Sequence, residues 1–293
     1  MTGDVSQARS RILPGRADAR AVAAAAAATA TITVLAALAA APVHADEPLW
    51  ELGAGLGGLS LPHYRGSEQS YHWLLPVPYL VYRGPIFVTD EDGTRAVLLD
   101  TEFVEVDISL GGSAPAKSSD NRARAGMPDL LGTVEIGPNL NLRLARGPLW
   151  KLELRLPVRA GFTLRLPVGS VGFTATPVLN LDVDIGGWDV GVRAGPLAAS
   201  RRFHAHFYDV DAAYATATRP AYAAAGGFAG WAAATSASRR LGDWWLAGFL
   251  RYDSVAGATF GGSPLVTRRD TFAFGLTASW IFKVSDERVA NRS

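Results

Sequence analysis

Hydrophobic and polar residues alternate in the stretch LWKLELRLPVR at residues 149–159. Apolar side chains occupy the even positions from Trp150 to Val158, and most of the odd positions are charged. Successive side chains of a β-strand point to opposite faces, so this strand has one apolar and one charged face. It fits a soluble sandwich whose charges meet water, or a membrane barrel whose charges line a wet interior.

The same alternation recurs along the chain, for example in TEFVEVDISL, LNLDVDI, WDVGVR and DTFAFGLTASWIF. No stretch after residue 46 shows a helical period, so we predict an all-β fold with about 12 strands. The expected strands are 49–60, 69–82, 85–90, 95–99, 102–111, 129–144, 149–160, 171–185, 188–199, 221–237, 243–256 and 270–282.

Short and long connections alternate between these strands. The short ones are 83–84, 100–101, 145–148, 186–187 and 238–242; the others are 61–68, 112–128, 161–170, 200–220 and 257–269, with 91–94 the one short exception. Outer-membrane barrels have tight periplasmic turns and long outer loops, and a soluble sandwich has no reason for this asymmetry. We therefore predict an antiparallel transmembrane β-barrel with both termini periplasmic.

Aromatic residues lie near the ends of several expected strands, on the face that would meet lipid. They are Trp50, Trp150, Trp188, Trp244, Trp280 and Phe282. Such positions suit the aromatic girdles at the two membrane interfaces. The first expected partner of the chain is thus outer-membrane lipid.

The first 45 residues differ in composition from the rest. Four arginines precede an alanine-rich apolar run, and Val43-His44-Ala45 follows it. This order is typical of a secretory signal peptide cleaved after Ala45; an uncleaved anchor helix is the alternative. The predicted domains are a signal peptide (1–45) and a barrel (46–293) that ends in a periplasmic tail (283–293).

Composition and charge exclude several functions. The formal net charge of +1 provides no bulk attraction for nucleic acid. The absence of cysteine excludes disulfides, thiolate metal sites and cysteine nucleophiles. No motif for a cofactor stands out, since the GAGLGG stretch has no helix after it.

The charges on the inner side of the expected barrel form the main candidate site. Gly186-Gly187 predicts a tight hairpin that brings Asp184 opposite Asp189. The inward charges expected in the middle of the chain are Lys151, Glu153, Arg155, Arg159, Asp182, Asp184, Asp189 and Arg193. They fit an ion-pair lattice, either lining an aqueous pore or plugging it; a bound cation and catalysis are the alternatives.

Three features of the expected outer loops are weaker candidates. His204-x-His206, with Asp209 and Asp211 nearby, places two imidazoles on one face of an extended segment; these are solvated, or they contribute to a metal site.

Lys117, Arg122 and Arg124 give loop 112–128 a positive charge that could contact lipopolysaccharide. His63 and Ser67 are the basis of a rim-active hydrolase hypothesis, although no nucleophile-elbow motif surrounds them.

Three motifs, in the same order along the chain, resemble those of the MipA/OmpV family (MltA-interacting protein-like outer-membrane proteins). The first, GAGLGGLSLPHYRGSEQSYHWLLPVPYLVYRGPIF, contains the family-motif residues Pro62, Tyr64, Gly66, Ser67, Pro76, Pro78, Tyr79, Tyr82 and Arg83. GMPDLLGTVEIGPNL and GSPLVTRRDTFAFGLTASWIF are similar to later family motifs. The chain departs from the usual terminal aromatic residue of such barrels, because KVSDERVANRS follows Phe282.

The resemblance implies a non-enzymatic protein in the outer membrane of a Gram-negative bacterium. It implies a scaffold that brings a murein lytic transglycosylase together with a penicillin-binding protein, or a porin-like channel for small solutes. A rim-active hydrolase is a third hypothesis, and no metal or cofactor is expected.

Overall fold

The computed structural model describes residues 47–83, 87–90 and 93–289. The expected signal peptide and its cleavage site lie outside the described residues. The strands are β1 (Glu47–Pro48), β2 (Trp50–Pro62), β3 (Ser70–Arg83), β4 (Phe87–Asp90), β5 (Gly93–Asp100), β6 (Val104–Ser113), β7 (Thr133–Gly147), β8 (Trp150–Thr163), β9 (Ser170–Ala175), β10 (Val178–Asp184), β11 (Asp189–Ala199), β12 (Gly227–Leu241), β13 (Trp244–Ser254), β14 (Asp270–Val284) and β15 (Arg288–Val289).

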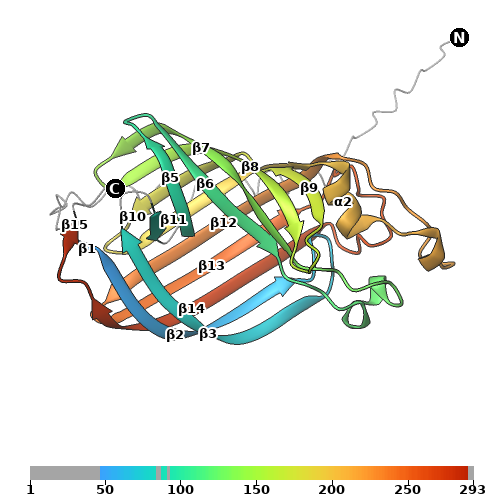
Figure 1. Cartoon of the computed structure of the whole chain (residues 1–293), viewed down its shortest axis with the longest axis horizontal. Coiled ribbons are helices and arrows are strands. Elements are labelled where there is room, and N and C mark those ends of the chain that lie inside the picture. Colours follow the sequence, from blue (N-terminus) through green and yellow to red (C-terminus); the bar gives the residue numbers. More distant parts are fainter. Residues whose placement is uncertain (1–46, 84–86, 91–92, 290–293) are drawn as a thin grey trace, which may run out of the picture. The chain divides into compact units, whose positions relative to one another are not determined.

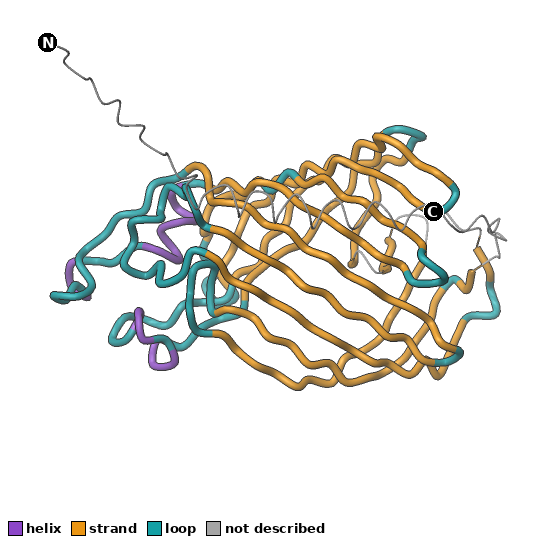
Figure 2. The backbone as a smooth tube through the Cα atoms, turned by 180° about the vertical axis from the view of Figure 1, so that it is seen from behind, coloured by secondary structure: helices purple, strands orange, loops and turns teal. Residues whose placement is uncertain are grey.

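Thirteen of these strands, β2 to β14, form one antiparallel sheet that closes on itself (Figures 1 and 2). β14 pairs with β2, and β8 and β11 each pair with both β9 and β10. β9 and β10 therefore share one position in the wall, separated by the break at Thr176-Pro177. The prediction of an antiparallel β-barrel with about 12 strands is confirmed.

The two ends of the barrel differ, as the connection lengths predicted. The end that carries β1, β15 and the tight turns is called the termini end, and the end that carries segments 63–69, 114–132, 200–226 and 255–269 is called the loop end (Figure 1). At the termini end, the turn through Gly186 and Gly187 has φ values of +63° and +77°. Glycine adopts these values without strain, so the Asp184 and Asp189 backbones pair directly.

The outer face of the ring is apolar along its strands. Leu56, Leu74, Leu80, Val192, Leu250, Phe272, Phe274 and Leu276 are all exposed there. The six aromatic residues expected near strand ends all lie at the termini end, and five of them are exposed: Trp150, Trp188, Trp244, Trp280 and Phe282. The paired strands of the ring satisfy their backbone groups internally, which a membrane-spanning structure needs. No helix among the described residues is long and apolar enough to cross a membrane.

Glycines on the inner side of β2 allow close contact with the strands beside it. A Cβ atom at Gly55 would lie 2.1 Å from the Ala278 carbonyl oxygen and 2.6 Å from the Ser279 Cα atom. A Cβ atom at Gly53 would lie 2.5 Å from the Trp280 carbonyl oxygen. The glycine-rich sequence of β2 is therefore required where it closes the ring against β14.

One short helix occurs in segment 200–220, which the sequence predicts to be a long connection. Helix α2 (Arg201–Tyr208) follows β11 at the loop end (Figure 1), with short 3-10 turns at Ser118–Asp120, Arg122–Arg124 and Ala212–Tyr214. Ser200 caps α2, because its side chain accepts a hydrogen bond from the Phe203 backbone N–H. Eight residues are too few to show a clear helical period in the sequence.

The end of the chain continues past the last expected strand. β14 extends to Val284, and β15 pairs with β1 through Val289 opposite Glu47 and Arg288 opposite Pro48. Two backbone hydrogen bonds, Leu49 N to Glu287 O and Ser285 N to Trp50 O, join the same segments. The two ends of the described chain thus form a small sheet at the termini end.

Candidate functional site

The eight expected inward charges share one face of the sheet. The register aligns Lys151 with Asp182 and Glu153 with Asn180 across β8 and β10, and Asp182 with Gly191 across β10 and β11. Glu153 and Asn180 are buried, whereas the alternate positions of these strands carry the exposed apolar side chains. This face is therefore the inner wall of the barrel.

Salt bridges connect several of the inner-wall charges. Arg155 contacts Glu153 at 2.9 Å and Asp182 at 3.4 Å. Lys151 Nζ lies 3.7 Å from the same Asp182 carboxylate, and Asn180 donates to it at 2.7 Å. Arg159 donates to Ser109 Oγ at 2.9 Å. Each carboxylate named here faces a cation or an amide donor, which is the pattern of a structural lattice.

A second polar cluster on β6 and β7 was missed by the sequence reasoning. Asp107 is 1 % exposed and accepts hydrogen bonds from Asn139 (3.0 Å) and Asn141 (2.7 Å). Arg143 continues the cluster through ion pairs with Asp100 at 2.8 Å and Glu105 at 3.1 Å. The polar residues that alternate with leucines in NLNLR could have indicated it.

The loop end contains its own hydrophobic core, which the polar composition of the loops did not predict. Tyr208 of α2 stacks on Phe260 with ring centroids 3.7 Å apart. The other buried members are Tyr64, Ala116, Leu130, Phe207, Val210, Ala224, Ala229, Val255 and Leu265. We call this cluster the cap core. It joins loops from four parts of the chain, and burial in it raises the pKa of Tyr64 to about 12.

The expectation that His204 and His206 lie on one face of an extended segment is wrong, because both residues belong to helix α2. His204 is buried, and its Nδ1 lies 2.7 Å from the Ala225 carbonyl oxygen. His206 Nε2 bonds to the Leu131 carbonyl oxygen at 2.9 Å. Residues two apart on a helix point in different directions, so the two rings hold separate loops. No group of residues suited to hold a metal ion occurs in the described part of the chain.

His63 and Ser67 lie close together, but their hydrogen bonds connect loops and do not form a catalytic arrangement. The buried Asn121 amide lies 3.1 Å from both His63 Nδ1 and Ser67 Oγ. Ser67 Oγ donates to the Gln69 carbonyl oxygen at 3.1 Å, so its proton is already directed away from His63. Burial lowers the pKa of His63. The cluster joins two loops and shows no activated hydroxyl.

The basic loop 112–128 is only partly a surface of free positive charge. Arg124 is buried and donates to the carbonyl oxygens of Phe207 (3.2 Å) and Pro128 (3.3 Å). Arg122 remains largely exposed but forms an ion pair with Glu68 at 2.5 Å. The expectation that Arg124 adds to an external cationic patch is therefore wrong, because its charge helps to hold α2.

Tyr64 and Gly66 of the first family motif join segment 63–69 to segment 255–269 at the loop end. The Tyr64 hydroxyl donates to the Leu265 carbonyl oxygen at 2.8 Å. Gly66 has a φ of +87°, and its carbonyl oxygen accepts hydrogen bonds from the backbone N–H groups of Thr267 and Arg268. At the other end of the motif, Arg83 contacts Glu47 at 2.6 Å and Glu51 at 3.0 Å.

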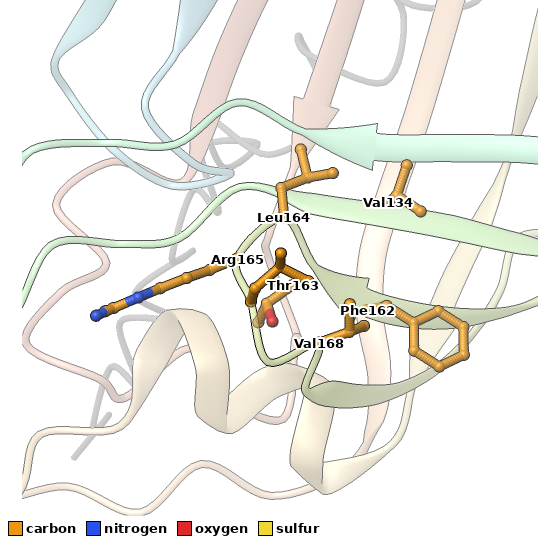
Figure 3. A pocket seen from close by; sticks show the side chains of 7 residues that line it. Val134, Phe162, Thr163, Leu164, Arg165 and Val168 are labelled. Atoms are coloured by element: carbon orange, nitrogen blue, oxygen red, sulfur yellow. The ribbon is translucent and has the colours of Figure 1, made fainter.

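A shallow apolar pocket lies beside the turn between β8 and β9. Its lining includes Val134, Phe162, Leu164 and Val168, and Arg165 extends away from these apolar side chains (Figure 3). Leu166 also belongs to the lining and is 84 % exposed. The pocket holds no carboxylate, histidine or cysteine, so its lining is suited to hydrocarbon contact rather than to catalysis.

Residues 54–282 match the family described as MltA-interacting protein MipA. The chain belongs to the MipA family. The match begins and ends within the barrel wall and covers the three motifs that resembled the family, except Gly53 at the start of the first. Together with the closed ring and its apolar exterior, it identifies the protein as an outer-membrane β-barrel.

Three solved structures are among those that resemble the barrel. Outer membrane phospholipase A from Escherichia coli is 10% identical, with 80% of this chain and 93% of that chain covered and a TM-score of 0.30. A porin is 11% identical (80% and 99% covered, TM-score 0.28), and the CymD monoaromatic hydrocarbon channel is 11% identical (81% and 89%, TM-score 0.33). No curated protein matches the chain.

Proposed function

We propose that this MipA-family barrel is a non-enzymatic docking protein that holds a murein lytic transglycosylase at the periplasmic side of the outer membrane. The observation that carries the proposal is the family match over residues 54–282, whose description names an interaction with MltA. A penicillin-binding protein is the second partner that the family resemblance implies.

The termini end supplies the docking surface in this proposal. β1 and β15 form an ordered sheet there, and the ion pairs of Arg83 with Glu47 and Glu51 attach it to the barrel wall. The exposed side chains of Arg288 in β15 and of Asp286 and Glu287 just before it add a polar surface beside this sheet. The surface is larger than the tight turns alone would provide.

The loop end and the inner wall also favour docking over transport. The loops pack around the cap core, and the inner-wall charges are cross-linked in pairs. The charged inner wall remains the one observation that favours the porin-like alternative. Purified protein in a planar bilayer tests it: stepwise conductance would support a channel, and a silent bilayer would exclude one.

Co-purification tests the docking proposal. Tagged full-length protein is isolated from detergent-solubilised envelope and probed for lytic transglycosylase and penicillin-binding protein. A variant that lacks residues 285–293 loses β15. We expect the amount of transglycosylase that co-purifies with this variant to be at least tenfold lower than with the unchanged protein. Ala217→Asp, at an exposed position of the loop end, is the matched control. Equal retention by all three proteins would contradict docking through the termini end.

A further inference from the structure

The barrel wall contains a break between β3 and β6. β3 pairs with β4 only at Tyr82 and Arg83, and β6 pairs with β5 only between Glu105 and Ile108. No described strand pairs with the remaining part of β3 on this side, so β12 and β13 are visible between β3 and β6 in Figure 1. The part of β3 before Val81 is about 36 Å long at 3.3 Å per residue.

Two prolines explain why this edge of β3 stays unpaired. The Arg83 N–H donates to the Leu49 carbonyl oxygen on the β2 side at 2.8 Å. Backbone groups alternate between the two edges of a strand, so Pro76 and Pro78 turn their nitrogens to the open edge. The ladder with β2 runs past both prolines without a register shift. Proline has no N–H, so the open edge lacks two successive donors.

Contacts at both ends give the break a defined frame. At the loop end, the Tyr71 hydroxyl donates to the Pro115 carbonyl oxygen at 3.1 Å, and Gln69 Nε2 donates to the Asp120 carbonyl oxygen at 2.8 Å. At the termini end, the short β4–β5 hairpin fills the wall. We call the framed break the window.

The inner wall beside the window is apolar, in contrast to the charged wall on β7 to β11. Trp73 and Leu75 of β3 face inward, and Leu75 is 45 % exposed. The register continues this band from Trp73 to Leu59, and across β14 to Phe249, which is 38 % exposed on the inner side. Exposed apolar side chains inside a barrel leave hydrocarbon-compatible surface without a described cover.

We propose that the window admits an acyl chain of a membrane lipid from the bilayer, and that the chain lies against Trp73, Leu75 and Phe249. The strands that border the window carry exposed apolar side chains on their outer faces, among them Leu74, Leu80 and Leu110, so lipid hydrocarbon is the neighbour that meets the window. A partner β-strand is disfavoured, because Pro76 and Pro78 interrupt the donors that a continuous ladder needs. The inference goes beyond docking and does not depend on it.

Quenching by brominated lipid tests the proposal on the full-length protein. The chain has no cysteine, so a single introduced cysteine carries one fluorescent probe. The proteins are reconstituted in vesicles of phosphatidylcholine with or without bromine on the acyl chains. Leu75→Cys and Val77→Cys report the inner side of the window. Leu276→Cys reports the lipid-facing exterior, and Ser236→Cys reports the inner side of β12.

We expect brominated lipid to quench the Leu75→Cys and Val77→Cys probes at least half as strongly as it quenches the Leu276→Cys probe. We expect the Ser236→Cys probe to be quenched less than one tenth as strongly as the Leu276→Cys probe. Window probes quenched no more than the Ser236→Cys probe would overturn the proposal. Two window positions are used in case one of the variants does not fold. Heat-dependent mobility in gels shows whether the barrel of each variant is folded. Loss of enzyme docking would leave this result unchanged.

Discussion

At the scale of single residues, buried polar groups in this barrel depend on partners from distant parts of the sequence. Asp107 is the shared acceptor of Asn139 and Asn141, and Asn121 joins His63 to Ser67. A buried polar group without its partner costs free energy because it has left water without compensation. Substitutions at these positions should therefore affect stability more than substitutions of exposed residues of the same type.

Replacing Asp107 by leucine tests this expectation on the inner wall. Asp107→Leu removes the acceptor of two buried amide donors, so we expect the free energy of unfolding to fall by about 1–3 kcal/mol. Denaturant unfolding in detergent, followed by tryptophan fluorescence, measures the change. The exposed Asp211→Leu is the control, with an expected change below about 0.5 kcal/mol. Equal effects at both positions would contradict the role of Asp107.

Acidification should loosen the cap core. Burial lowers the pKa of His204, and its Nε2 has no partner among the described residues. As pH falls below the unfolded value of about 6.5, the unfolded loop binds a proton before the folded loop does, so stability is lost. The protection factors of residues 201–208 against hydrogen exchange, which are corrected for the intrinsic exchange rate at each pH, should therefore fall between pH 7.5 and pH 5.

His204→Gln should flatten that pH dependence, because the side chain no longer titrates. His72→Gln, at an exposed position of β3, should leave it as in the unchanged protein. Burial also lowers the pKa values of His63 and His206, so some pH dependence should remain in His204→Gln. A pH profile that is flat in the unchanged protein would contradict the effect.

At the scale of elements, strand composition decides which edges can pair. Glycines in β2 allow it to pack closely on β14, and prolines in β3 keep its other edge unpaired. The two strands are neighbours in sequence but affect the ring in opposite ways. β2 closes the ring by packing on β14, and β3 leaves most of one edge without a partner strand.

A valine at Gly55 should prevent the ring from closing normally. Its Cβ atom would lie 2.1 Å from the Ala278 carbonyl oxygen, so β2 and β14 must separate. We expect a loss of about 3 kcal/mol or more, seen as loss of the heat-modifiable folded band in gels. Gly58→Val is the matched control, because a Cβ atom there meets nothing within 4 Å. Similar folding of both variants would refute the close-contact argument.

At the scale of the whole molecule, the two ends of the barrel have different constructions. The loop end has a core of its own, whereas the termini end has tight turns, a small sheet and all six of the expected girdle aromatics. Docking of cell-wall enzymes at the termini end requires that this end faces the periplasm.

Cysteine labelling of intact cells checks this orientation. Ala217→Cys lies at the loop end and Asp286→Cys at the termini end, both at exposed positions. An impermeant maleimide should label Ala217→Cys in intact cells and Asp286→Cys only after lysis. The unchanged protein contains no cysteine and gives the background. The reverse pattern would contradict both the orientation and docking through the termini end.

The sequence by itself determined the strands and the class of fold, because a period of two is a local property of the chain. It located most of the ring strands to within a few residues, although it joined β9 and β10 into one strand and began the strand of β12 at residue 221 instead of Gly227. It also identified the Gly186-Gly187 turn, since a tight turn depends on its own residues. It also placed the expected inner charges on one face, because each strand's alternation fixes its faces. The helix at 201–208 was missed, since it is short and is stabilised by contacts outside itself.

Only the tertiary structure decided which residues meet. Arg124, His204 and Tyr208 are polar or aromatic residues of loops, and they became buried because four separate loops converge on one core. The window likewise follows from the short pairing of β4 and β5 with their neighbours, although the prolines that keep its edge unpaired were visible in the motif. Contacts between distant segments depend on the closure of the whole ring, and no local pattern records them.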